Sequence, residues 1–226
     1  MALRVARDAL SRIFYQRCFY LFVMLLALIA LAPFAPATHQ GRLATNGINA
    51  FVVIATVAAI GRTLLSFVIV LLLAAPTLGF QWLGLADDDA RWLAYSWMFG
   101  AGLYFVTTAY LLRYVFQPDV MTADKLFGAA ASYLMIGILW GYLYALLGYA
   151  YPNAFMVAGQ PGTLDYYEAL YLSMTVLTSV GFGDITPLVR QARAVCIVEQ
   201  VVGALFVAIL IARLAGVYPP HQREPE

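Results

Sequence analysis

The chain has 226 residues, of which 63% are hydrophobic and only 11% are charged, and its mean hydropathy is +0.81. Soluble domains carry about 25% charged residues, so this composition excludes a soluble globular protein and indicates an integral membrane protein. The formal net charge of +1 gives no support to a nucleic acid as partner. The partner that the composition implies is the lipid bilayer.

The N-terminal segment, residues 1–17, has arginines beside an apolar face, a pattern typical of a helix that lies on the membrane surface. The apolar run that begins at Cys18 resembles the core of a secretory signal. However, its length of about 18 residues exceeds the 7–15 residues of such a core, which favours a retained first span. Cys18 and Cys196 both lie in apolar stretches, so we interpret them as buried hydrophobic residues, not as a disulfide or metal pair.

Six stretches are long and apolar enough for transmembrane helices, which need about 17–25 mostly apolar residues. They run over 18–35, 43–61, 64–83, 92–116, 127–150 and 189–215. The shortest break between them is Gly61-Arg62-Thr63, where we expect a tight helical hairpin. The predicted fold class is therefore an all-α membrane protein with six transmembrane helices.

A different kind of segment lies between the last two stretches. Residues 151–164 read as a loop, and Asp165 stands three residues before Glu168, which is a capping-box pattern. The helix predicted from Tyr166 to Leu177 has about 18 Å of length at 1.5 Å per residue. It is too short to cross a hydrocarbon core of about 30 Å. Because non-helical backbone at that depth must be buried in protein or line a wet cavity, we expect a re-entrant pore helix.

The stretch that follows this short helix consists of Thr178, Ser179, Val180, Gly181, Phe182, Gly183 and Asp184. A potassium selectivity filter is built from four T-V-G-Y-G-type loops whose backbone carbonyls replace the hydration shell of the ion. Gly181 and Gly183 lack a Cβ and can adopt the positive φ that points successive carbonyls at one axis. Ser179 adds a hydroxyl oxygen, and Val180 and Phe182 are expected to turn outward against the wall. An ordinary Gly-rich turn is the alternative, and the position between two spans disfavours it.

About residues 125–216 resemble the pore module of potassium channels of the voltage-gated-like superfamily, with outer helix, pore helix, T-S-V-G-F-G-D-I-T-P and inner helix. The Gly-Phe-Gly variant departs from the commoner Gly-Tyr-Gly, and serine replaces the usual threonine. The resemblance implies that Asp184 lies at the outer mouth and that Gly203 is a hinge of the inner helix. It implies K⁺ coordination by oxygens of Ser179, Val180, Gly181 and Phe182.

One filter segment per chain has a consequence for assembly, because a closed ring of carbonyls needs four such loops. We therefore expect a cyclic homotetramer. Residues on the last span recur at spacings of three and four, which fits either the cavity below the filter or packing against the outer helix. These residues are Ala204, Val207, Ile211 and Ala215. In the first case an apolar ring at Ile211 is the candidate gate, closing by dewetting.

Glu199 is a carboxylate deep in the last predicted span. Intramembrane ionisable residues are functional candidates because charge is costly there. The other interpretation is a hydrogen-bonded group packed behind the pore helix, near Ser173 or Thr175. Glu199 lies about 80° from the stripe on the helical wheel, which favours this supporting role for the pore helix.

The expected orientation follows from the basic residues. With the N-terminus inside, nine of the 13 Lys and Arg lie on the inner face and four on the outer face, as the positive-inside rule requires. This predicts a plasma (inner) membrane protein with both termini cytoplasmic. The predicted domains are a cytoplasmic amphipathic segment (1–17), a four-span sensor-like domain without gating charges (18–116), a cytoplasmic linker (117–126), the pore domain (127–215) and a short cytoplasmic tail (216–226).

The predicted function is a potassium-selective channel. We expect little or no voltage sensing, because the fourth span has only Arg91 and Arg113 at its ends, whereas a voltage sensor needs about 3–4 charges per subunit. K⁺ is then the permeant ion, and no cofactor is expected. We expect no enzyme, since no nucleophile–base or metal-ligand cluster appears. A weakly selective cation channel and a non-conducting scaffold with a relic filter stay open as alternatives. A transporter is disfavoured because the chain shows no internal repeat.

Overall fold

The computed structural model describes residues 17–31, 34, 43, 47, 49–54, 64–87, 89–118 and 121–217. The described helices are α2 (Arg17–Leu31), α4 (Leu64–Asp87), α5 (Ala90–Val115), α6 (Ala123–Ala150), α7 (Tyr166–Leu177) and α8 (Arg190–Val217). Three short strands accompany them, namely β1 (Phe155–Val157), β2 (Gln160–Gly162) and β3 (Ile185–Pro187). The fold is thus mostly helical, as predicted.

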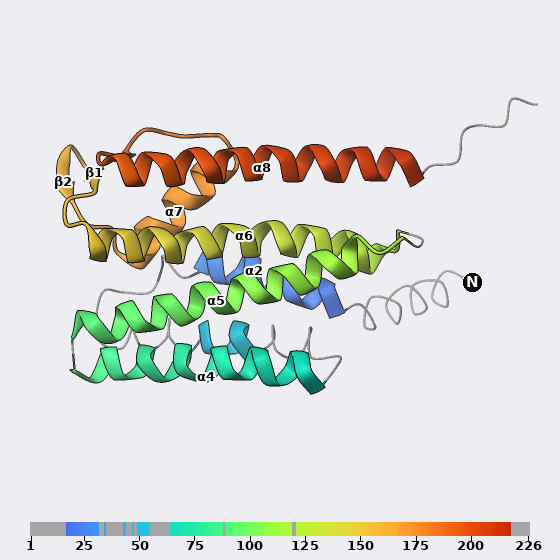
Figure 1. Ribbon diagram of the computed structural model, residues 1–226, viewed down its shortest axis with the longest axis horizontal. Helices are drawn as coiled ribbons and strands as arrows, with labels where there is room; N and C mark the ends of the chain where they lie inside the picture. Colours follow the sequence, from blue (N-terminus) through green and yellow to red (C-terminus); the bar gives the residue numbers. More distant parts are fainter. Residues whose placement is uncertain are drawn as a thin grey trace, which may run out of the picture.

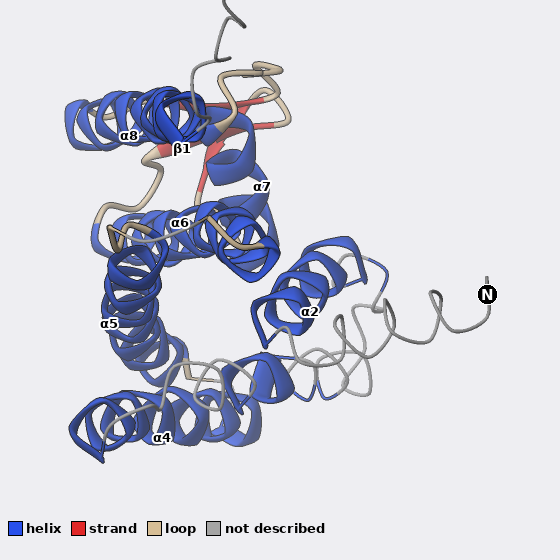
Figure 2. Cartoon of the chain, turned by 90° about the vertical axis from the view of Figure 1, so that its right-hand side faces the viewer, coloured by secondary structure: helices blue, strands red, loops and turns tan. Residues whose placement is uncertain are grey.

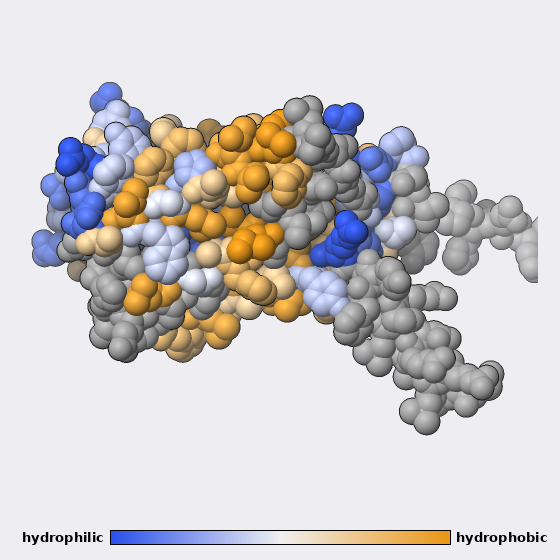
Figure 3. Space-filling view, turned by 90° about the horizontal axis from the view of Figure 1, so that it is seen from below, coloured by the Kyte–Doolittle hydropathy of each residue, from blue (hydrophilic) through white to orange (hydrophobic). Residues whose placement is uncertain are grey.

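The long helices lie side by side (Figure 1). Helices α8, α6, α5 and α4 follow one another across the molecule, α2 lies to one side of this row, and α7 lies between α6 and α8 (Figure 2). On the face drawn in Figure 3, apolar residues gather in the middle and hydrophilic residues gather toward the two ends. Such a distribution is typical of a protein whose middle contacts acyl chains and whose ends contact water.

Three described helices are long and apolar enough to cross a membrane, over Ser66–Gly84, Ala123–Ala150 and Arg190–Ala215. They correspond to the predicted third, fifth and sixth spans. The first predicted span, 18–35, overlaps α2, an apolar helix of 15 residues. The fourth, 92–116, is helical as α5, but glycines, hydroxyl side chains and aromatic rings make it less apolar than the other long helices. That these two cross the membrane stays a prediction.

Several predictions fall outside the described residues. These are the surface helix over 1–17 apart from Arg17, the break at 61–63 and the tail beyond 217. Of the predicted second span, 43–61, residues 43, 47 and 49–54 are described, and they are helical. The last helix continues to Val217, two residues past the predicted end of the pore domain.

The start of α6 corrects the predicted linker boundary, since the helix begins at Ala123 and not at residue 127. The Thr122 side chain accepts a hydrogen bond from the Lys125 N–H, which is the N-cap arrangement that threonine favours. Asp124, in the first turn, accepts hydrogen bonds from the Tyr114 hydroxyl at 2.8 Å and from the Cys18 N–H at 3.0 Å. This carboxylate therefore joins α5 and α2 to the start of α6.

The segment 151–164, predicted as a loop, contains a small hairpin. Strand β1 pairs antiparallel with β2 and with β3, in the order β2-β1-β3. The turn between β1 and β2 has positive φ at Ala158 (49°) and Gly159 (79°). Strands of three residues are too short for an alternating pattern to reveal them. Strand β3 directly follows residues 178–184, which we call the filter stretch. The sheet therefore joins the far end of the filter stretch to the hairpin before α7.

Candidate functional site

Helix α7 has the predicted bounds, Tyr166–Leu177, and both its ends are capped. Asp165 Oδ1 accepts from the Glu168 N–H at 2.8 Å, and Glu168 Oε2 accepts from the Asp165 N–H at 2.9 Å, so the predicted capping box is present. At the other end the Thr178 hydroxyl donates to the Met174 carbonyl at 2.7 Å. The short helix therefore begins and ends where local side chains complete its hydrogen bonds.

Two glycines of α6 let α7 approach closely. A Cβ on Gly137 would lie 2.5 Å from Met174 Cε, and one on Gly141 would lie 3.2 Å from the Leu170 Cα. Glycines four residues apart form a smooth strip on a helix, as at the small-residue interfaces of membrane helices. This four-residue spacing is present in the sequence and is the signal that indicates such a contact.

Gly203 on α8 has a similar position at the other end of α7. A Cβ on Gly203 would lie 2.1 Å from the carbonyl oxygen of Leu177, the last residue of α7. The same carbonyl accepts a hydrogen bond from the Tyr133 hydroxyl at 3.0 Å. A glycine is therefore required here by close packing alone, and the hinge role stays a prediction.

The sign of the backbone angle φ alternates along the filter stretch. Ser179, Gly181 and Gly183 have φ values of 58°, 52° and 82°, and the residues between them have no positive φ. The two glycines were predicted to reach this region, whereas Ser179 was not, because side chains with a Cβ rarely adopt it. Alternation of this kind turns successive peptide planes the same way, so that their like groups can face a common direction.

The N–H groups of this stretch point back toward α7. Val180 and Gly181 both donate to the Thr175 carbonyl, at 2.9 and 3.1 Å, and Ser179 donates to the last turn of the helix at 2.9 Å. Within the described part of the chain, no hydrogen bond ends at a carbonyl of residues 178–183. The donors therefore fasten the loop while its carbonyl oxygens stay available.

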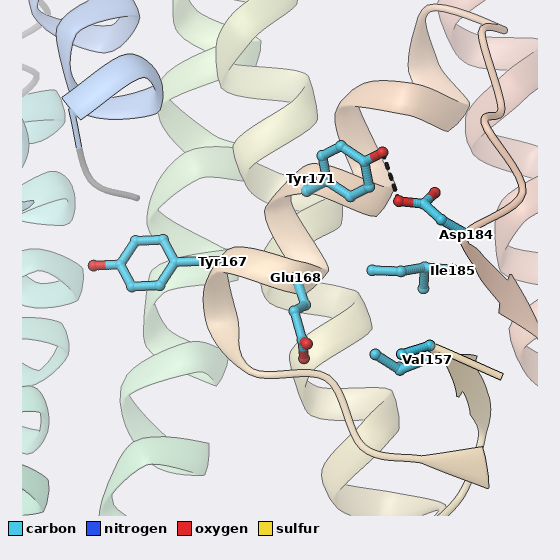
Figure 4. A pocket seen from close by; sticks show the side chains of 7 residues that line it. Val157, Tyr167, Glu168, Tyr171, Asp184 and Ile185 are labelled. Carbon is cyan, nitrogen blue, oxygen red and sulfur yellow. Dashed lines mark hydrogen bonds between the residues drawn. The ribbon is translucent and has the colours of Figure 1, made fainter. Parts of the chain in front are cut away.

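Side chains at the far end of the stretch also contact α7. The Phe182 ring stacks on the Tyr171 ring with centroids 6.4 Å apart and planes 7° from parallel, so the ring lies beside α7. The Tyr171 hydroxyl donates to Asp184 Oδ2 at 2.8 Å (Figure 4). A hollow of about 460 Å³ beside this pair is lined by Val157, Ala158, Tyr167, Glu168, Tyr171, Asp184 and Ile185.

Glu199 is completely buried behind α7. Its Oε1 lies 2.5 Å from Ser173 Oγ, and its Oε2 accepts a hydrogen bond from the Tyr144 hydroxyl. The expected neighbour Ser173 is therefore found, while the Thr175 hydroxyl bonds to a carbonyl within α7. The carboxyl group joins α8 to α7 and α6 by hydrogen bonds, and its role in supporting the pore helix stays a prediction.

The predicted stripe on α8 is not covered by the rest of the chain. Ala204, Val207, Ile211 and Ala215 are all exposed, and Ile211 keeps 60% of its surface. Packing against the chain's own outer helix therefore does not explain the stripe. The lumen and gate roles stay predictions, because a single chain encloses no cavity there.

Residues 132–218 match a family model described as ion channel. The match begins within α6 and takes in α7, the filter stretch and α8. No curated protein and no solved structure matches the chain. The chain therefore carries an ion channel domain with a potassium-channel-like pore region, which is a membrane channel module and not an enzyme. Residues before 132 lie outside this match.

Proposed function

We propose that the ion channel domain over residues 132–218 conducts K⁺ passively and selectively across the membrane. The observation that carries the proposal is the backbone of residues 178–183. Positive φ alternates along it, its N–H groups bond to α7 and its carbonyls accept no hydrogen bond within the described residues. A row of such oxygens is the ligand that replaces water around a dehydrated monovalent cation.

In this proposal Thr178 to Gly183 form the filter, and each chain contributes one strand of it. Oxygens of Ser179, Val180, Gly181 and Phe182 coordinate the ion. The C-terminal end of α7 directs the negative end of its dipole toward the filter, which favours a cation there. Asp184 adds a carboxylate at the outer mouth.

The working unit is a homotetramer, because one strand of carbonyls cannot surround an ion. The exposed apolar face of α8 supports this assembly. Val201 and Leu205 keep about half of their surface in the single chain. They are available to contact neighbouring copies, while the stripe that contains Ile211 faces the common axis as the candidate gate. Gly203 and Ile211 are the proposed hinge and gate.

A weakly selective monovalent cation channel is the second candidate, and Phe182 favours it. A tyrosine at this position offers a hydroxyl for a hydrogen bond behind the filter, whereas Phe182 has no hydroxyl and its ring stacks on Tyr171. We further propose the orientation expected from the sequence, with the 151–188 region outside and both termini in the cytoplasm of a plasma (inner) membrane protein.

The test is ion flux through purified protein in liposomes. We expect uptake of K⁺ and Rb⁺ far above that of Na⁺, and loss of uptake in Gly181→Ala, since alanine at a φ of 52° is strained where the carbonyls must align. Gly159→Ala is the matched control. It has a φ of 79° and open space around the new Cβ, as Gly181 has, but lies in the hairpin turn.

Equal K⁺ and Na⁺ uptake by the wild-type protein supports the weakly selective channel and overturns potassium selectivity. Absence of flux from a folded tetramer supports a non-conducting scaffold. Equal losses in both alanine variants would show that backbone strain anywhere disables the protein, which contradicts a special role of Gly181.

A further inference from the structure

Four polar groups meet behind α7, one from each of four residues on three helices. They are the Glu199 carboxyl of α8, the Ser173 hydroxyl of α7, and the Tyr144 hydroxyl and Gly137 carbonyl of α6. Ser173 Oγ lies 2.7 Å from the Gly137 carbonyl oxygen and 2.5 Å from Glu199 Oε1. All three side chains are completely buried.

A count of protons fixes the state of the carboxyl group. The Gly137 carbonyl oxygen lies 2.7 Å from Ser173 Oγ and has no proton to donate. The hydroxyl proton of Ser173 must therefore lie between these two atoms. Two oxygens that approach to 2.5 Å need a proton between them, and Ser173 has no second one to give. Glu199 must therefore carry the proton of this contact. The Tyr144 hydroxyl donates to the other oxygen of the same group.

The surroundings of Glu199 agree with a neutral group. The ion pair found among the described residues joins Arg91 to Asp89, so no described cation is paired with Glu199. The titratable groups that face it are Tyr133 and Tyr144 from α6 and Cys196 from α8. All of these are uncharged when protonated, and an unpaired buried carboxylate is costly in protein and in a membrane.

We infer that Glu199 is a neutral carboxylic acid that donates a hydrogen bond to Ser173 and thereby positions α7, and with it the filter, between the inner and outer helices. The chain of donors runs from Glu199 to Ser173 to Gly137. Gly137 also packs directly against α7, since a Cβ added to it would lie 2.5 Å from Met174 Cε. Ionisation of Glu199 would leave Ser173 between two acceptors with one proton, and one of the two contacts would become repulsive.

The protonation state is tested by infrared spectroscopy of the purified tetramer at neutral pH. We expect the C=O stretching band of a protonated carboxyl group in the wild-type protein and its absence in Glu199→Gln. Glu168→Gln is the matched control, because Glu168 is a carboxylate of α7 that accepts from the backbone, and it should leave the band unchanged. Ser173→Ala removes one hydrogen bond of the acid and should shift the band. Absence of the band in the wild-type protein overturns the inference.

The positioning role is tested by flux and rests on the proposed function. A glutamine amide can donate to Ser173 and accept from Tyr144 as the neutral acid does, so Glu199→Gln should conduct within about twofold of the wild type, well under the tenfold change that 1.4 kcal/mol would produce. Glu199→Ala should lose most conduction. A Gln variant that assembles normally but conducts as poorly as the Ala variant would contradict the inference. If the wild type itself does not conduct, the proposed function fails, and the infrared band still decides the state of Glu199.

Discussion

At the residue scale, the filter stretch is a backbone conformation that neighbouring groups impose. Ser179, at a φ of 58°, is in a region that costs a non-glycine residue on the order of 1–3 kcal/mol. Its N–H and those of Val180 and Gly181 bond to α7, and these bonds offset the cost. The glycines could be predicted from the sequence because their freedom is intrinsic. The strain at Ser179 could not, because it arises from contacts with α7.

Tyr171 carries the residue-scale prediction. Its hydroxyl bonds to Asp184 and its ring stacks on Phe182, so one side chain contacts the far end of the filter stretch in two ways. Tyr171→Phe keeps the ring and removes the bond to Asp184. We expect channels that open normally but whose K⁺ current decays several-fold faster during sustained recording, because the outer mouth is less restrained. Tyr151→Phe, another exposed tyrosine, is the control. An unchanged decay in Tyr171→Phe would show that the bond has no part in holding the filter.

At the element scale, α7 shows what local sequence can and cannot specify. Its bounds could be predicted because Asp165 and Glu168 cap it locally. Its packing on α8 could not, because no local pattern indicates that Gly203 contacts the carbonyl of Leu177. The hydrogen bond from Tyr144 to Glu199 joins residues 55 positions apart. Glu199 could be singled out from the sequence because a carboxyl group is unusual within a span. Nothing in the sequence distinguished Tyr144 as its partner.

Gly203→Ala separates a packing role from a hinge role. The new Cβ would lie 2.1 Å from the Leu177 carbonyl, so α8 or the end of α7 must move. We expect a loss of stability of about 1–3 kcal/mol, as for overpacked interiors, together with reduced K⁺ selectivity. Thermal unfolding and flux ratios measure the two effects. Gly79→Ala, on α4 with open space around the new Cβ, should change neither. Full stability and selectivity with altered open probability would instead show that the close contact is not required and that Gly203 acts only as the proposed hinge.

At the scale of the whole molecule, one end of the helix row joins the leading helices to the channel domain. Arg213, near the end of α8, donates to the carbonyls of Phe116 and Gln117 at 3.0 and 2.5 Å, just after α5 ends. These contacts bridge 97 and 96 positions of the chain, so no sequence pattern indicated them. The candidate gate region of α8 is therefore fastened to the same segment that connects α5 to α6.

Through this contact a movement of α5 could reach the candidate gate region, as in a voltage-gated channel. The charges of α5 argue against voltage as the stimulus. A voltage sensor moves charge across the membrane field, and moving one elementary charge changes the free energy by about 2.3 kcal/mol per 100 mV. Such a sensor needs about 3–4 charges per subunit. Arg91 and Arg113, the basic residues of α5, both lie at its ends and are exposed. Arg91 bonds to Asp89 at 2.8 Å, and these bonds hold the pKa of the Asp89 carboxyl below its usual value. The residues that α5 buries between them are uncharged.

We therefore predict a conductance that changes little with voltage. In symmetrical K⁺, the conductance–voltage curve should correspond to a gating valence below about two elementary charges, because two terminal arginines that stay at the interfaces cross little of the field. Arg113→Gln should leave the slope of the curve unchanged, whereas Arg213→Gln, which removes the charge at the contact with Phe116 and Gln117, should alter open probability at all voltages alike. A steep curve that flattens in Arg113→Gln would show that α5 moves charge, and would make the four leading helices a voltage sensor after all.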